Sequence, residues 1–200
     1  MFEVPNAELF YLTQKNTLKR KSVHDELRGK KVVVYFVCGA YTPTCSTKHV
    51  PEYEAAYDEI KSLGIDEVYC CSMNDPWVMK AWWKSMGIKK QKYLCDGNGA
   101  WLLRFEEIAS AGQKVIQFFN TGMGRRAWRH ALVIHDNIVM HEVEEAPATG
   151  EKNNSPDDPY EFTTAQAIID YLKAREEVKN KNLEFNESHS SLSDPTDVNI

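Results

Sequence analysis

The chain has 200 residues, 42% of them hydrophobic and 26% charged, with a formal net charge of −5 at pH 7. This length favours a single domain, and the hydrophobic content is ample for a globular core. The acidic balance lacks the basic footprint of a nucleic-acid-binding protein. No apolar run approaches the ~20 residues that a membrane-spanning helix needs. We therefore expect neither a nucleic-acid partner nor a membrane segment.

The N-terminus and the cysteines both indicate a reducing compartment. Residues 1–5 lack the charged and apolar regions of a signal peptide. An odd cysteine count argues against a disulfide framework, so we expect the cytoplasm, or an organelle if a leader has been removed. No two cysteines are spaced as C-x-x-C, which disfavours a thioredoxin-style thiol–disulfide oxidoreductase and a zinc site. We expect no metal and no cofactor. The five cysteines are Cys38, Cys45, Cys70, Cys71 and Cys95.

Strand-like runs and helical periodicity alternate through the first half of the chain. Short strands and turns are expected over residues 8–31. Further on, Asp75 provides an N-cap before Pro76 at the first helical position. Gly64 and Gly87 are placed to end helices. The predicted strands are 32–37, 67–73 and 92–95, and the predicted helices are 46–63 and 76–86.

The second half predicts a hairpin and a final helix. Two apolar runs, 131–135 and 138–143, flank Asp-Asn and indicate the hairpin. Residues 163–166 offer a capping box for the last helix. Residues 179–200 have little apolar content, so we expect a disordered tail after a domain that spans 1–178. Strands alternating with helices favour an α/β fold.

Cys45 stands where the predicted strand 32–37 gives way to the helix that begins near Ser46. The backbone N–H groups at a helix N-terminus are unpaired, and the macrodipole there favours negative charge. A thiolate is negative, so this thiol should be more acidic and more reactive than a free one. The alternative interpretation is a buried structural cysteine, because free thiols are often buried.

The segments around Cys45 resemble those of a known family, the type II (peroxiredoxin-five-like) peroxiredoxins. The resemblance runs from about Val4 to Leu172 and implies a thioredoxin-like fold with a central mixed sheet flanked by helices. Relative to the family, we expect an insertion near 109–120. The matching motifs, in chain order, are Gly-Ala-Tyr-Thr-Pro-Thr-Cys-Ser (39–46), His-Val-Pro (49–51), Ser-Met-Asn-Asp-Pro-Trp-Val-Met-Lys-Ala-Trp (72–82), Asp-Gly-Asn-Gly (96–99) and Gly-Met-Gly-Arg-Arg-Ala-Trp-Arg (122–129).

The resemblance implies roles for three residues. Cys45 would be the peroxidatic nucleophile, whose thiolate attacks one peroxide oxygen and becomes a sulfenic acid. The hydroxyl of Thr42 would donate to the thiolate or the peroxide, and Arg129 would lower the thiol pKa and stabilise the developing charge. The alternatives are a plain turn residue and a surface arginine. Arg125 and Arg126 are expected at the surface.

Two other cysteines are candidates for resolving the sulfenic acid. Cys38 stands where the family usually has proline, which puts the rate of peroxide reduction in doubt and makes pairing with Cys45 conceivable; the alternative is a small apolar substitute. Cys70 lies where plant type II enzymes keep a resolving cysteine. It adjoins Cys71 in a strand, so the two should face opposite sides and can both be inert. His49 is expected to order the start of the helix.

Together these features predict a thiol-dependent peroxidase that reduces hydrogen peroxide and small alkyl hydroperoxides. The resemblance implies that an external thiol, either glutaredoxin with glutathione or thioredoxin, reduces the sulfenic acid, and that the protein forms a homodimer. The alternative function is a redox-sensing or binding protein on the same fold, with weak peroxidase turnover. Peroxide consumption with a reductant distinguishes the two.

Overall fold

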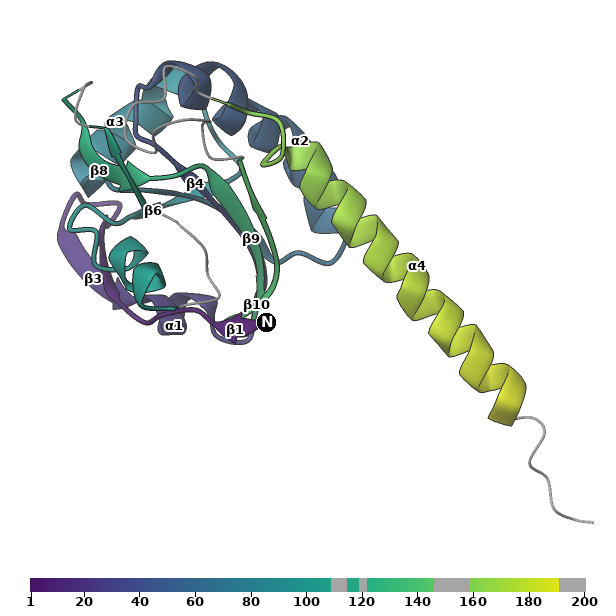
Figure 1. The fold of residues 1–200 in the computed structure, drawn as a ribbon. Helices are drawn as coiled ribbons and strands as arrows, with labels where there is room; N and C mark the ends of the chain where they lie inside the picture. The colour runs from purple at the N-terminus through teal and green to yellow at the C-terminus, as the bar shows by residue number, and fades with distance from the viewer. Residues whose placement is uncertain (109–114, 119–121, 146–158, 191–200) are drawn as a thin grey trace, which may run out of the picture.

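The computed structural model describes residues 1–108, 115–118, 122–145 and 159–190. Its centre is a mixed eight-stranded sheet with the order β1-β10-β9-β4-β5-β6-β2-β3 (Figure 1). β4, β5 and β6 are parallel to one another and the other neighbours pair antiparallel. The predicted α/β architecture with a central mixed sheet is confirmed. The strands are β1 (Phe2–Glu3), β2 (Glu8–Leu12), β3 (Leu18–Ser22), β4 (Lys31–Val37), β5 (Glu67–Ser72), β6 (Lys92–Cys95), β9 (His130–His135) and β10 (Ile138–Glu144).

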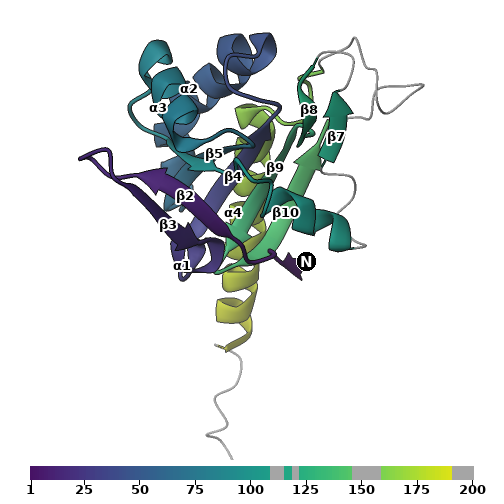
Figure 2. The same ribbon diagram turned by 90° about the vertical axis from the view of Figure 1, so that its left-hand side faces the viewer.

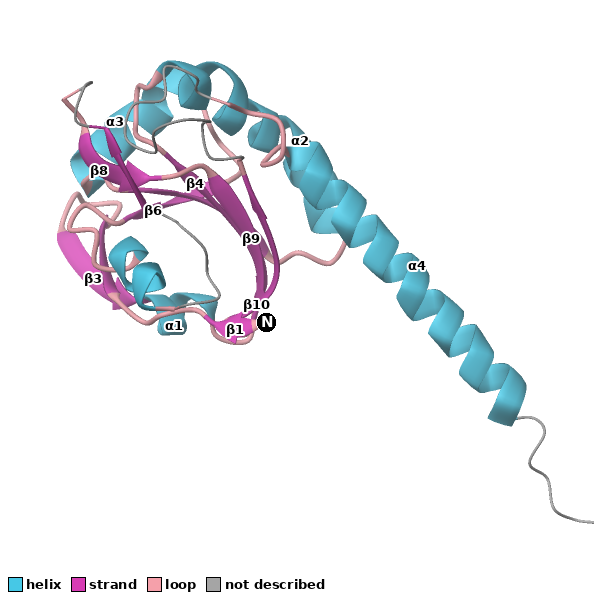
Figure 3. Ribbon diagram, viewed as in Figure 1, coloured by secondary structure: helices cyan, strands magenta, loops and turns pink. Residues whose placement is uncertain are grey.

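Helices cover both faces of the sheet (Figures 2 and 3). On one face, α2 (Val50–Ser62), α3 (Pro76–Met86) and the start of α4 (Ala165–Ser190) pack in a single apolar cluster. On the other face, α1 (Val23–Leu27) and a 3₁₀ helix (Leu102–Glu107) belong to a second cluster. A strand whose two faces are both buried reads as a continuous apolar run. The Val-Val-Val-Tyr-Phe-Val sequence of β4 is such a run, and its side chains alternate between the two clusters.

The helix boundaries follow the local signals in the sequence. The carboxylate of Asp75 accepts from the backbone N–H groups of Trp77 and Val78, both at 2.9 Å, and caps α3. Gly87 closes this helix with φ of 69°, in the left-handed region where glycine is favoured. The predicted helix of residues 76–86 and its two end signals are confirmed.

The hairpin of β9 and β10 is also confirmed. Asp136 and Asn137 connect the two strands with φ of 47° and 66°, as a tight hairpin turn requires. The expected insertion near 109–120 lies largely outside the described residues. Within it, β7 (Val115–Phe118) pairs with β8 (Gly124–Ala127) in a separate two-stranded sheet.

The last helix is longer than the sequence predicted. The buried side chains of α4 lie in its first two turns and end at Leu172, and the helix then extends away from the body of the protein (Figure 1). It continues through 179–190, where we expected a disordered tail; residues 191–200 lie outside the described residues. No helix in the described part of the chain is long and apolar enough to cross a membrane.

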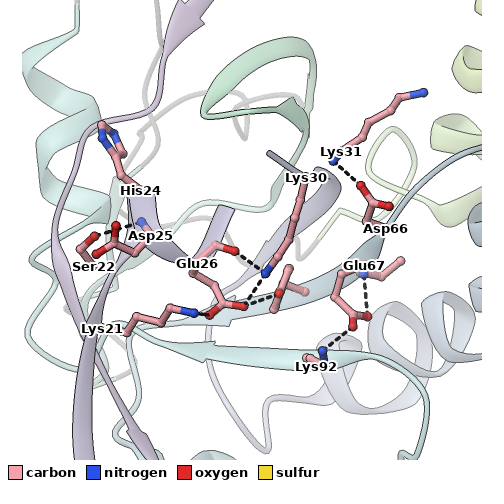
Figure 4. A network of polar contacts seen from close by, with 12 residues as sticks. Lys21, Ser22, His24, Asp25, Glu26, Lys30, Lys31, Asp66, Glu67 and Lys92 are labelled. Atoms are coloured by element: carbon pink, nitrogen blue, oxygen red, sulfur yellow. Dashed lines mark hydrogen bonds and ion pairs between the residues drawn. The ribbon is translucent and has the colours of Figure 1, made fainter. Parts of the chain in front are cut away.

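A half-buried ionic network lies on the α1 side of the sheet (Figure 4). The Glu26 carboxylate accepts from Lys21 at 2.7 Å, from the Tyr69 hydroxyl at 2.5 Å and from Lys30 at 3.2 Å. Burial alone would raise the pKa of Glu26, but these three donors together lower it. The network therefore holds α1 against the sheet through a charged cluster.

Candidate active site

The candidate site begins at the end of β4, where the chain turns into α2. After Val37 the chain forms a loop, and Cys45 opens a π-helical turn, Cys45–His49, that leads into α2. The N–H of Ser46 donates to the Thr42 carbonyl at 3.0 Å, which closes the loop onto this turn. Tyr41 has φ of 63°, an uncommon value for a residue with a side chain. Such wide helical turns and uncommon backbone conformations are frequent at functional sites.

Arg129 contacts Cys45 from a distant part of the chain, 84 positions later in the sequence. It lies between β8 and β9 and is 1% exposed. Its Nη1 donates to the Cys45 Sγ at 3.2 Å, and its Nε donates to the Pro159 carbonyl at 2.9 Å. The guanidinium is thus held from two directions. The structure brings together the two residues that the sequence analysis placed at the centre of the site.

The surroundings of Cys45 favour its thiolate. Interaction with the Cys38 side chain has the largest effect and lowers the Cys45 pKa; burial opposes it, and His49 and the Arg129 charge lower it further. The net result is a pKa well below the ordinary value of a cysteine, although the side chain is fully buried. A buried thiol without such partners would be shifted in the opposite direction.

Thr42 lies in the loop with its hydroxyl directed at the backbone. Its Oγ1 donates to the Gly39 carbonyl at 2.8 Å. A hydroxyl has one proton to donate and two lone pairs to accept with. In this geometry Thr42 can accept a hydrogen bond from a peroxide O–H, whereas a donor was expected from the sequence. Its own carbonyl accepts from the N–H of Ser46, the residue after Cys45.

Cys38 lies directly after β4 and is 3% exposed. Interaction with the Cys45 side chain, followed by burial, raises the Cys38 pKa well above its ordinary value. The same interaction lowers the pKa of Cys45. The lower pKa of the two therefore belongs to Cys45.

Cys70 is in the same apolar cluster but has different neighbours. It lies on β5 opposite Tyr35 in the register, and the Tyr35 hydroxyl donates to the Gln91 side chain at 2.5 Å. Burial raises the Cys70 pKa well above its ordinary value. Among the interactions of the described residues, no hydrogen bond joins it to Cys45. Cys71 belongs to the cluster on the other face, so the expected opposite orientation of the two cysteines is confirmed.

His49 is a buried histidine at the edge of the site. Its ring contacts those of Tyr35, Tyr53 and Tyr160 with centroids 4.7, 5.5 and 4.8 Å apart. Within the described part of the chain, neither ring nitrogen has a hydrogen-bond partner of good geometry, although the ring is close enough to lower the Cys45 pKa. Burial lowers the pKa of His49, so the ring is neutral at pH 7.

Arg126 corrects the expectation of a surface residue. It is half-buried, and its Nε and Nη1 donate to the carbonyls of Met123 at 3.0 Å and Met73 at 3.3 Å. A Cβ added to Gly39 would lie 3.6 Å from its Nη1, so it borders the active-site loop. Arg125 is exposed and pairs with Glu106 at 2.6 Å, as a surface residue would.

Glu145 is a supporting residue that the sequence analysis missed. It is 1% exposed, and its carboxylate accepts from the backbone N–H groups of Glu161, Phe162 and Thr163 at 2.8–3.1 Å and from the Thr163 hydroxyl at 2.8 Å. Its own N–H donates to the Arg129 carbonyl at 3.0 Å. Glu145 therefore ties Arg129 to the segment whose Pro159 carbonyl accepts from the guanidinium.

Asn74, two residues after the end of β5, supports the loop that leads to Cys45. Its Oδ1 accepts from the Ala40 N–H at 2.9 Å and from the Ser72 hydroxyl at 2.7 Å. The indole of Trp82 on α3 donates to the Ser46 hydroxyl at 3.1 Å. Both residues fall in the motif at 72–82, so that segment positions the loop rather than contacting the sulfur.

Comparisons with known proteins agree with this geometry. The family model described as Redoxin matches residues 3–157. "Peroxiredoxin y4vD" of Sinorhizobium fredii is 37% identical over 76% of each chain, and "Peroxiredoxin-2B" of Arabidopsis thaliana is 40% identical over 70% of this chain and 84% of its own. A structure of reduced Prx3 from Vibrio vulnificus in complex with hydrogen peroxide is 30% identical, with a TM-score of 0.72 over 85% of this chain and 96% of that one. The expected thioredoxin-like fold is confirmed.

Proposed function

The chain is a peroxiredoxin, a thiol peroxidase of the Redoxin family, and we propose that it reduces hydrogen peroxide and small alkyl hydroperoxides through a sulfenic acid at Cys45. The observation that carries this proposal is the 3.2 Å contact between the Arg129 guanidinium and a buried Cys45 sulfur whose pKa is lowered. A thiolate, not a thiol, is the nucleophile in cysteine chemistry.

The proposed reaction uses the charges already in place. The Cys45 thiolate attacks one peroxide oxygen, the O–O bond breaks, and the other oxygen leaves as hydroxide or alkoxide and takes up a proton. Arg129 stabilises the charge that moves from sulfur to the leaving oxygen, because its donors are fixed before the reaction. Thr42 orients the peroxide by accepting a hydrogen bond from its O–H.

Substrate entry requires the loop to move. Cys45 is fully buried, whereas Tyr41 and Pro43 on the same loop are exposed. A small peroxide therefore reaches the sulfur when residues 39–44 move aside, which is a common way for an enzyme to exclude water. The similar Vibrio vulnificus structure that contains hydrogen peroxide supports the choice of substrate.

The reductant and the assembly are further parts of the proposal. An external thiol, from glutaredoxin with glutathione or from thioredoxin, returns the oxidised protein to the reduced state. We also propose a homodimer and a cytoplasmic location, with an organelle as the alternative. Peroxide consumption measured with each reductant in turn identifies the physiological class.

The direct test is peroxide consumption by variants of two buried cysteines. Cys45→Ser should abolish it, because an alcohol is not ionised at neutral pH and is a poor nucleophile. Cys95→Ser is the matched control: Cys95 is in the same apolar cluster, burial raises its pKa to about 12, and its variant should stay close to wild type. Substantial activity in Cys45→Ser would refute the assignment.

The second candidate function is a redox sensor with weak turnover. It is favoured by the buried Cys38 thiol beside Cys45, because a protein whose oxidised pair is slowly reduced would store the signal. Rapid oxidation followed by negligible steady-state turnover with every reductant would support the sensor. Sustained turnover would support the peroxidase.

A further inference from the structure

Cys38 and Cys45 make an unusual pair for a site with one nucleophile. Both side chains are buried in the same cluster, each affects the pKa of the other, and the Arg129 charge lowers the pKa of both. Cys38 lies just past the last paired residue of β4, since the register with β5 ends at Val37 and Ser72. Its backbone is therefore the first part of the loop and not part of the sheet ladder.

The position of the negative charge decides which of the two sulfurs can react. While Cys45 is a thiolate, its charge keeps Cys38 protonated. Once Cys45 has become a sulfenic acid, that charge is gone, and with it one cause of the raised Cys38 pKa. Burial still raises this pKa, while the Arg129 guanidinium still lowers it, so ionisation of Cys38 is easier after oxidation of Cys45 than before it.

We propose that Cys38 is the resolving cysteine and that it forms a disulfide with Cys45 inside the active-site loop. This inference rests on the proposed function, since it needs the sulfenic acid as its substrate. In the reaction, the Cys38 sulfur attacks the Cys45 sulfur, the S–O bond breaks, and an S–S bond forms. The hydroxide that leaves combines with the proton from the Cys38 thiol, so the product is water.

The geometry favours Cys38 over Cys70 for this role. Cys38 and Cys45 stand at the two ends of one loop and are buried in the same cluster. Six residues, 39–44, separate them, so closing this loop with a disulfide costs little entropy. Cys70 is held in the ladder of β5 between two parallel neighbours, β4 and β6. To pair with Cys45 it would have to move against this ladder, whereas Cys38 lies outside it.

The test is a single oxidation followed by mass spectrometry. Reduced protein receives an equimolar amount of hydrogen peroxide without a reductant, then dimedone to trap sulfenic acid, and is mapped by peptides. Wild type should lose two hydrogen atoms, yield a crosslinked Cys38–Cys45 peptide and carry no dimedone. Cys38→Ser and Cys38→Ala should instead carry dimedone on Cys45. Cys70→Ser should behave as wild type, and Cys95→Ser serves as the control.

The outcomes separate this inference from the proposed function. Dimedone on Cys45 of the wild type, a Cys45–Cys70 disulfide, or a disulfide between two chains would overturn the role of Cys38 while leaving Cys45 as the nucleophile. A wild-type protein whose Cys45 stays unmodified would remove both proposals. Thermal unfolding of the two Cys38 variants confirms that they are folded.

Discussion

Cys45 and Cys70 are equally buried in one apolar cluster, yet their pKa values are shifted in opposite directions. Burial raises the pKa of Cys70, which has a tyrosine hydroxyl beside it in the sheet. Cys45 opens a helical turn and accepts from Arg129, and Cys38, His49 and Arg129 all lower its pKa. Burial alone makes a thiol inert, so reactivity here comes from the partners that reverse its effect.

The Glu26 network provides a useful parallel on the opposite face. There, too, burial is outweighed by donors, and the carboxylate stays charged. Its three donors are side chains that join α1 to neighbouring strands and to the end of the helix, so that charge stabilises structure. At Cys45 the anion is the proposed nucleophile.

The largest change is expected from Arg129→Lys. Lysine keeps the charge but cannot donate to the Cys45 sulfur and the Pro159 carbonyl from one rigid plane. Loss of one fixed donor to a developing charge slows a reaction by about a hundredfold, and the Cys45 pKa should rise toward that of Cys70. Stopped-flow oxidation measures the rate. Arg125→Lys, at an exposed ion pair, is the control; equal rates in the two variants would contradict the account.

A smaller change is expected when the Cys38 donor is removed. Cys38→Ala should raise the Cys45 pKa and slow oxidation at neutral pH roughly tenfold, the worth of a hydrogen bond to a charged group. Cys38→Ser keeps an O–H donor and should stay near the wild-type rate for this first step. If Ala and Ser behave alike, the hydrogen bond is not what distinguishes Cys45 from Cys70.

Glu145→Gln tests whether Arg129 must be held in place. The amide has weaker acceptor strength toward the three backbone N–H groups and the Thr163 hydroxyl, so the variant should lose about 1–3 kcal/mol of stability. Oxidation should slow about fivefold, as expected when Arg129 loses part of its orientation. Urea unfolding and stopped-flow oxidation measure the two effects. Glu161→Gln, at an exposed side chain, should change neither.

The smallest effect is expected for Arg126→Lys. Lysine can replace one of the two carbonyl contacts, to Met123 or Met73, but not both. Because Arg126 borders the loop without contacting the sulfur, oxidation should slow about twofold and the Cys45 pKa should stay low. A pKa that rises as far as in Arg129→Lys would give Arg126 a direct electrostatic role.

The sequence predicted the local elements well because their signals are local. Asp75 and Gly87 mark the ends of α3, and the alternating clusters on β4 follow from its apolar run. The contact between Arg129 and Cys45 joins residues 84 positions apart. No local sequence pattern predicts this contact, and only the resemblance to a known family indicated it.

The misses have physical causes as well. Glu145 is a buried carboxylate in a stretch whose polar composition predicts an exposed loop, and the N–H groups that donate to it come from residues 161–163, farther along the chain. Arg126 is next to Arg125, and sequence alone does not say which of two adjacent arginines turns inward. The extended α4 has little apolar patterning after Leu172, so composition favoured disorder.

The most direct test of the central claim is a pH titration of thiolate absorbance in the fully reduced protein. The difference between wild type and Cys45→Ser isolates one thiol. Because a lowered pKa places the thiolate at lower pH, the account predicts that the Cys45 signal is present at pH 7 and disappears on acidification, well below the ordinary cysteine value of about 8.5. A Cys45 signal that develops only at or above that value would contradict it.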